Sequence, residues 1–256
     1  MNIREVKSLD ELVAAVVDIW QDKPGWLWFR GHRDARWKLQ PTVWRDYTVE
    51  QERYMSNRFY ARARTRYANP PANDDWAGWL SLMQHYGLPT RLLDWSLSPQ
   101  VAAFFATSKY HDAANIETKA ACIWVIDAIK LNKSQGFEAV APPMNAWMAE
   151  PLVRPALQEN REGTSPAKVI AAMAVEADPR MQVQQGAFTV HTTQEPLTEL
   201  SCTDDWLYQF VIPADGARLI AWQLRILGVC EADLFPDLEH LASDLRNEFL
   251  PRGKRT

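Results

Sequence analysis

The segment 121–127 (ACIWVID) is apolar at nearly every position and limits the folds open to the rest of the chain. A short apolar run of this kind is typical of a strand that lies inside a sheet and is covered on both faces. Further strands are expected at 26–30, 186–192 and 207–213. Because strands and helices mix along the chain without strict strand–helix–strand alternation, we expect an α+β fold. We expect this fold to be built on a single mixed or antiparallel sheet with surrounding helices.

Helices are predicted from capping signals and from apolar residues at helical spacing. Ser8 and Glu11 form a capping box, and Ser98 precedes a proline at the first helical position. The stretch from Leu88 to Ser96 is expected to be irregular. The predicted helices cover 9–20, 49–67, 76–86, 99–111, 165–177, 217–227 and 236–250.

The chain has 256 residues, of which 47% are hydrophobic, and a net charge of −4. These values indicate one folded domain over 1–256, and they provide no overall attraction to nucleic acid or acidic membranes. The sequence contains no apolar run of about 18 residues, so no membrane contact is expected. Three widely spaced cysteines suggest neither a disulfide framework nor a metal site, and we expect a cytoplasmic location.

Polar residues at the end of the 26–30 strand form the first candidate site. Arg30 ends an apolar strand and is followed by Gly31, which lets a backbone or a ligand approach closely. The planar guanidinium group suits bidentate recognition of phosphate or carboxylate. The alternative is that Arg30 forms a buried structural ion pair.

The second candidate site lies between Gln84 and Ser96, where glycine and proline interrupt a dense run of polar side chains. Loops held on rigid elements are common places for binding and catalytic residues. A structural alternative exists here too, because Asp94 could pair with Arg91 or Arg30. Four arginines at 58, 62, 64 and 66 have a simpler interpretation, since positive charge at the end of a helix stabilises its dipole.

These residues resemble a known family, the FRG domain, which is named for an aromatic-Arg-Gly motif. The matching segments, over about 22–241, are Phe29-Arg30-Gly31, Leu39-Gln40-Pro41 with Arg45, Glu52, QHYGLPTRLLDWSLSPQVAAFFA (84–106), CIWVID, Arg180-Met181 with Gln184, Gly186 and Phe188, and Leu234 to Leu238. Residues from about 137 to 178 match nothing in this pattern and are interpreted as an insertion. The resemblance implies an anti-phage defence or toxin-like context, with an antitoxin or another defence-system protein as partner.

The order of the motifs is also similar to that of ADP-ribosyltransferases, which implies such a fold and NAD as substrate, with no metal. The implied catalytic residues are Arg30, His85, Asp94 and Gln184. The implied NAD-binding residues are Arg30, Gly31, Tyr86, Thr90, Arg91, Trp95 and Ser96. Classical transferases have a glutamate where this chain has Gln184 and Gln185, so Glu52 and Asp94 are further candidates for the acid.

Three functions remain open from the sequence. The first is an NAD-consuming ADP-ribosyltransferase or NAD glycohydrolase acting on a protein or nucleic acid. The second is a non-enzymatic recognition or regulatory domain of a defence system. The third, a nuclease or hydrolase, is disfavoured because the sequence shows no dense Asp/Glu/His metal constellation. The motifs GxGxxG, GxxxxGK[ST], HExxH and GxSxG are absent.

Overall fold

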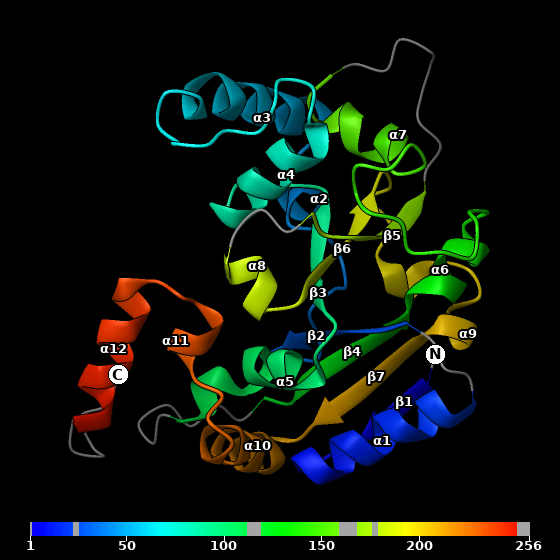
Figure 1. Cartoon of the computed structure of the whole chain (residues 1–256). Helices are drawn as coiled ribbons and strands as arrows, with labels where there is room; N and C mark the ends of the chain where they lie inside the picture. The colour runs from blue at the N-terminus through cyan, green and yellow to red at the C-terminus, as the bar shows by residue number, and fades with distance from the viewer. Residues whose placement is uncertain (1, 23–25, 112–118, 159–167, 176–178, 250–256) are drawn as a thin grey trace.

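The computed structural model describes residues 2–22, 26–111, 119–158, 168–175 and 179–249. One seven-stranded sheet runs through the molecule, and helices pack around it (Figure 1). The strand order is β1-β7-β4-β2-β3-β6-β5. Only β1 and β7 pair in parallel, and all other neighbours are antiparallel. The expected α+β fold with a mixed sheet is therefore confirmed.

The strands agree with the apolar runs in the sequence. The predicted strands at 26–30, 121–127, 186–192 and 207–213 are all present, and the all-buried β4 lies between β7 and β2 as expected. The strands are β1 (Asn2–Glu5), β2 (Leu27–His32), β3 (Leu92–Ser96), β4 (Ala121–Asp127), β5 (Val169–Met173), β6 (Gly186–His191) and β7 (Leu207–Ile212).

Most predicted helices are present with shifted ends. The longer ones are α1 (Leu9–Asp22), α3 (Val49–Ala63), α4 (Trp76–His85), α5 (Pro99–Thr107), α10 (Ala214–Ile226) and α12 (Leu238–Phe249). The shorter ones are α2 (Val43–Asp46), α6 (Ala128–Ser134), α7 (Glu150–Val153), α8 (Pro179–Val183), α9 (Thr203–Trp206) and α11 (Glu231–Leu234). Within the described residues, no helix combines the length and apolarity that a membrane crossing requires.

Two sequence expectations about secondary structure are wrong. The helix predicted at 165–177 is the edge strand β5 over its described central part, because five residue pairs join Val169–Met173 to β6. A short apolar run fits a buried strand and a buried helix equally well, so the sheet partner decides. The stretch expected to be irregular up to Ser96 ends in β3. The segment interpreted as an insertion thus contributes a strand to the sheet, and β1 was not predicted.

The two faces of the sheet are covered differently. Side chains alternate between faces along a strand, so Leu27 and Phe29 face one side and Trp28 faces the other. On the first side, α1, α5 and α10 cover one half of the sheet, while α3, α4 and α7 cover the half formed by β3, β6 and β5. On the second side, a single cluster with four buried tryptophans extends across β4, β2, β3 and β6.

The sheet opens between β2 and β3, where the two covered halves meet. A single residue pair, Phe29 with Ser96, joins these strands, whereas the other neighbouring strands share four to six pairs. Beyond that pair the ladder would place Gly31 opposite Asp94, but no such pair forms. The backbone groups on both strands past this point therefore need other partners.

Gly31 packs its backbone directly against α5, and this contact fixes where the opening lies. A Cβ atom at this position would overlap the carbonyl oxygen of Ala102 and lie 2.6 Å from the amide nitrogen of Ala106. Both are backbone atoms, so the whole helix would have to move. We expect Gly31→Ala to lower the free energy of unfolding by about 1–3 kcal/mol, as overpacking does. Denaturant unfolding followed by circular dichroism measures this change.

Gly186→Ala is the matched control, because it also adds a methyl group at a strand position. Its Cβ atom would meet nothing closer than the Met181 carbonyl oxygen at 3.6 Å, which is ordinary contact. This variant should therefore keep nearly the stability of the unmodified protein. Equal losses in the two variants would show that Gly31 is not packed against α5 as described.

Candidate active site at the opening between two strands

The Arg30 side chain fills the opening between β2 and β3. Its Nη1 donates to the backbone carbonyl of Asp94 at 2.6 Å and lies 3.6 Å from the Oδ2 of the same residue. Its Nε donates to Nε2 of His32 at 3.1 Å. The guanidinium group thus donates to the Asp94 carbonyl, which would accept a hydrogen bond from a β2 backbone amide if the two strands were paired here. No hydrogen bond involves Nη2 within the described part of the chain.

Asp94 lies in the middle of β3, but its side chain is 54% exposed. Its Oδ2 accepts a hydrogen bond from Nε2 of Gln84, on α4, at 2.8 Å. The Thr90 hydroxyl donates to Oε1 of Gln84 at 2.5 Å, which fixes the orientation of the amide. Asp94 is therefore held in place on one oxygen, while Oδ1 has no partner among the described residues.

Positive charge exceeds negative charge around the opening. Burial lowers the pKa of Arg30, the Asp94 carboxylate opposes this shift, and the charge of Arg45 adds to it. Arg45 is exposed, and its guanidinium donates to the carbonyl of Gln40. Burial, then Arg30 and Arg45, lower the pKa of His32 to about 3. His32 is therefore neutral at physiological pH, and two arginines face one carboxylate.

Arg91 is a buried structural residue of this region and does not lie on its surface. It belongs to what we call the frame, the buried contacts that join α2, α3 and α7 to the start of β3. Its guanidinium forms a bidentate ion pair with Glu52 of α3, with the shortest distance 2.5 Å, and both side chains are at most 2% exposed. Nη1 donates to the carbonyl of Leu152 at 2.9 Å, and the group lies 5.6 Å from the Trp44 ring. Arg91 thus links α2, α3 and α7 to the start of β3. Neither Arg91 nor Glu52 can reach a ligand from this position.

Three other residues expected to bind NAD are also buried and engaged within the protein. Thr90 is buried and orients Gln84. The indole Nε1 of Trp95 donates to the Thr189 hydroxyl at 3.0 Å. The hydroxyl of Ser96 donates to the carbonyl of Gln184 at 2.7 Å. These contacts hold the walls of the opening together, and the exposed groups beside them are left for a ligand.

The remaining predicted residues lie around the same region. The side-chain amide of Gln184 donates to the carbonyl of Leu234 at 2.9 Å, and Gln185 adopts a left-handed backbone with φ of 48° before β6. Tyr86 is 59% exposed and packs edge-on against His85, with 4.9 Å between the ring centres. The structure therefore brings Arg30 and Asp94 into contact, and places Gln184 beside Ser96, two positions along β3.

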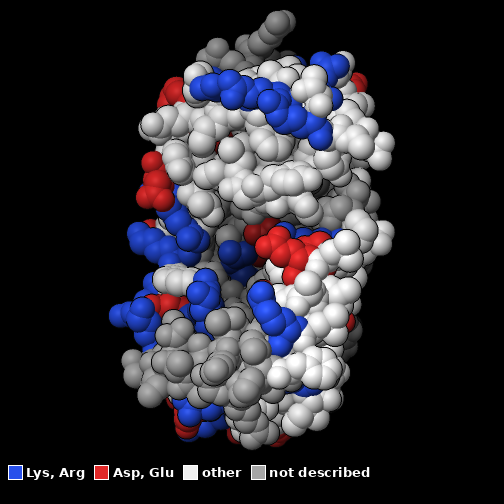
Figure 2. Space-filling model, turned by 90° about the vertical axis from the view of Figure 1, so that its left-hand side faces the viewer, with Lys and Arg blue, Asp and Glu red and all other residues white. Residues whose placement is uncertain are grey.

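The face of the molecule formed by α3, α4, α8 and α12 is hollowed at mid-height (Figure 2). Basic and acidic side chains both surround this hollow, which lies at the height of α8 and β3 in Figure 1. No group of three or more His, Cys, Asp or Glu side chains in the described ranges is arranged to hold a metal ion.

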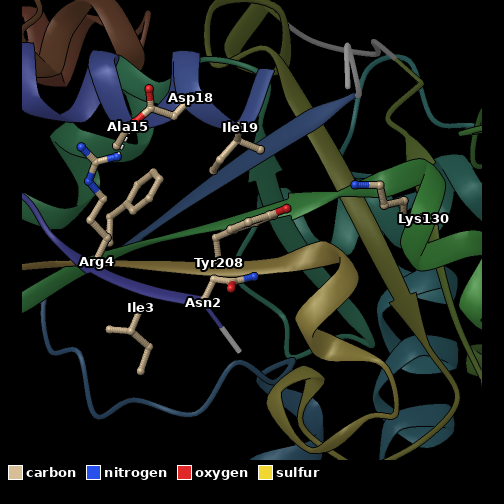
Figure 3. Close-up of a pocket in the computed structure, with 9 residues that line it drawn as sticks. Asn2, Ile3, Arg4, Ala15, Asp18, Ile19, Lys130 and Tyr208 are labelled. Carbon is tan, nitrogen blue, oxygen red and sulfur yellow. Dashed lines mark hydrogen bonds and ion pairs between the residues drawn. The ribbon is translucent and has the colours of Figure 1, made fainter. Parts of the chain in front are cut away.

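A second groove lies at the other end of the sheet, between α1, β1 and β7 (Figure 3). Arg4 crosses it to Asp18 at 2.6 Å, and Lys130 at its rim pairs with Asp127 at 3.1 Å. Both cations are therefore already compensated. None of the predicted site residues lines this groove, so the opening between β2 and β3 is the stronger candidate.

Comparison with protein families identifies part of the chain. Residues 26–115, from β2 past α5, match the sequence model of the FRG domain. The resemblance to the FRG domain is thus confirmed over this segment. It contains both sides of the opening, Arg30 and Asp94, together with the Arg91–Glu52 pair, although it covers less than half of the chain. No curated protein and no solved structure matched the chain.

Two residues that position Arg30 and Asp94 were not singled out from the sequence. His32 follows Arg30 by two positions on one strand, so the alternation of side chains contained a signal for their contact. Gln84 reaches Asp94 from a different helix. No local spacing predicts that contact, since it depends on how α4 packs on the sheet.

We expect Glu52→Gln to lower the free energy of unfolding by about 3–5 kcal/mol, because it leaves the Arg91 charge buried without its partner. Asp94→Asn is the matched control, since it makes the same chemical change on a half-exposed side chain. Denaturant unfolding of both variants provides the comparison. If Asp94→Asn lowered the free energy of unfolding as much as Glu52→Gln does, Asp94 would be a structural residue like Glu52 and not an exposed residue of the candidate site.

Two buried histidines make the stability depend on pH. The pKa values of His32 and His191 are both lowered to about 3, first by burial and then by neighbouring arginines. Between pH 6.5 and 3 the unfolded chain binds protons that the folded chain does not, so stability falls as pH falls. We expect a loss of about 1–2 kcal/mol per histidine between pH 7 and pH 5.

Chemical unfolding at pH 7, 6 and 5 measures this slope. His191→Gln should reduce the slope, whatever its effect on stability at pH 7, because one of the two groups no longer titrates. A protein whose stability does not change over this range would show that the two histidines can be protonated in the folded state.

Proposed function

We propose that this FRG-domain protein consumes NAD and transfers ADP-ribose to a macromolecular acceptor. The observation that supports the proposal is the pairing of Arg30 with Asp94 across the opening in the sheet. It places a cation with unused donors beside a carboxylate with an unused oxygen. Both groups suit NAD. A cation binds its anionic pyrophosphate, and a carboxylate stabilises the ribose, which becomes positively charged during the reaction.

The cationic side of the opening suits the pyrophosphate. Arg30 is held by His32 and by the Asp94 carbonyl, so its orientation is fixed before a ligand arrives. Its side chain is 21% exposed, and Nη2 has no partner in the described structure. An oriented guanidinium binds phosphate oxygens with little loss of side-chain entropy. Arg45 adds a second positive charge, whose effect is felt at Arg30 and His32.

The carboxylate side suits the bond-breaking step. The bond between the ribose carbon and the nicotinamide nitrogen breaks, and nicotinamide leaves with the electron pair. Positive charge grows on the ribose, and the acceptor then forms the new bond to that carbon and gives up a proton. A fixed carboxylate beside the ribose stabilises this charge, as in glycosidases. Asp94, oriented by Gln84, fills this role in our proposal.

Of Tyr86 and Trp95, the two aromatic residues expected to pack against nicotinamide, Tyr86 is the accessible one. It is 59% exposed, whereas Trp95 is 3% exposed and bound to Thr189. His85, in ring contact with Tyr86, completes this side of the proposed site.

One observation favours the alternative of a non-enzymatic recognition domain. Gln184, at the position where classical transferases have a glutamate, uses its amide to hold the Leu234 carbonyl. In that case the opening binds an anionic ligand without chemistry. A partner from a defence system, with the protein acting as toxin or effector, stays a prediction of the family resemblance.

Arg30→Ala should weaken NAD binding roughly 10- to 100-fold, because a hydrogen bond to a charged group contributes about 1.5–3 kcal/mol. Arg30→Lys should not restore full affinity, since a lysine lacks the planar fork. Calorimetric titration with NAD measures both changes. Arg225→Ala, which removes an exposed arginine on α10, is the matched control and should bind like the unmodified protein.

Asp94→Asn separates binding from catalysis. We expect this variant to bind NAD and to release nicotinamide at least tenfold more slowly, as followed by chromatography. If the unmodified protein binds NAD without releasing nicotinamide, the recognition-domain alternative is correct. If it shows neither heat nor a thermal shift at millimolar NAD, the proposed substrate is wrong.

A further inference from the structure

Four arginines gather at the C-terminal part of α3 and in the turn that follows it: Arg58, Arg62, Arg64 and Arg66. All four are exposed. Within the described residues none of them forms an ion pair with a carboxylate. The chain as a whole has a net charge of −4, so this concentration of uncompensated positive charge is a local feature.

Two of these arginines share one face of α3 with Tyr54. Residues 54, 58 and 62 are four apart, which is the spacing of neighbours on one helical face, about 6 Å apart. Arg66, in the turn after the helix, reaches back to the Arg62 carbonyl. Figure 2 shows a band of basic side chains at the height of α3, on the same face as the hollow. A linear anion can therefore contact several of them at once.

Tyrosines, not carboxylates, position two of these side chains. The Arg58 guanidinium lies 5.4 Å from the Tyr54 ring centre and donates to its hydroxyl at 3.1 Å. The Arg64 guanidinium lies 5.8 Å from the ring of Tyr60. An aromatic face orients a guanidinium without neutralising its charge. Tyr54 is itself 63% exposed, so part of its ring surface is available to a ligand.

The helix dipole does not account for the whole group. Arg66 caps the end of α3 by donating from Nη1 to the Arg62 carbonyl at 2.7 Å. Thr65 donates to the same carbonyl at 3.2 Å. The effect of the dipole is confined to the last turn, and Arg58 lies before it. The helix dipole therefore does not explain Arg58, and no carboxylate in the described protein neutralises its charge.

We propose that this face, formed by Tyr54, Arg58, Arg62 and Arg66, binds the phosphate backbone of a single-stranded nucleic acid. Unpaired arginines beside an exposed aromatic ring are the features that bind backbone and base in such complexes. A membrane surface fits less well, because it requires an apolar helix face, and Tyr54 is the only exposed large hydrophobic side chain of α3. This inference is independent of the proposed reaction with NAD.

Fluorescence anisotropy with labelled oligothymidine and oligouridine tests the proposal. We expect binding that weakens with salt, with a slope of about −0.7 in log K against log salt for each phosphate contact. Combined Arg58→Ala, Arg62→Ala and Arg66→Ala should reduce affinity at least tenfold and make the slope about 2 units shallower. Tyr54→Ala should lose about tenfold and Tyr54→Phe should not, because the ring stacks on a base.

The matched control combines Arg218→Ala, Arg225→Ala and Arg246→Ala, which remove three exposed arginines from α10 and α12. It should bind as the unmodified protein does. Absence of binding at low salt would overturn the proposal, as would equal weakening by both triple variants. Binding to phosphatidylserine vesicles but not to oligonucleotides, or tighter binding to duplex DNA, would also overturn it. Circular dichroism confirms that each variant is folded.

Discussion

The candidate site depends on one hydrogen bond within the sheet that a side chain donates where a backbone amide normally would. Between β2 and β3 the ladder stops after one residue pair, and the Arg30 guanidinium donates to the Asp94 carbonyl in place of a backbone amide. Because the Arg30 side chain and not a paired strand joins β2 to β3 at this point, the two strands stay apart. The same contact brings the charge of Arg30 close to the Asp94 carboxylate. The contact between Arg30 and Asp94 therefore both joins the two strands and brings together the two side chains of the proposed reaction.

A rigid frame allows the sheet to remain open. The buried Arg91–Glu52 pair connects the start of β3 to α3, and a further hydrogen bond from Arg91 reaches the carbonyl of Leu152 in α7. On the other side, Gly31 lets α5 approach β2 more closely than any larger residue permits. Each half of the sheet is thus packed against its own helices. The polar residues of 84–96 divide accordingly into buried ones that hold the frame and exposed ones, such as Asp94 and Tyr86, that face solvent.

The sequence predicted the parts of the fold that local patterns determine. β4 is apolar throughout, and α5 begins with a serine cap before proline, so both were found close to their observed bounds. β5 was assigned to a helix because its short apolar run fits both structures, and only pairing with β6 distinguishes them. In the candidate site, its position before Gly31 singled out Arg30, which the structure places in contact with Asp94. The partner of Arg91 was not, since a contact between α3 and β3 depends on packing and not on spacing.

A crystal structure of the protein soaked with NAD tests whether the opening between β2 and β3 binds this ligand as proposed. We predict density for the pyrophosphate against Nη2 of Arg30, with the ribose attached to nicotinamide beside Oδ1 of Asp94. NAD bound in the groove between α1, β1 and β7, or bound at the opening with neither of these two contacts, would show that the proposed binding mode is wrong.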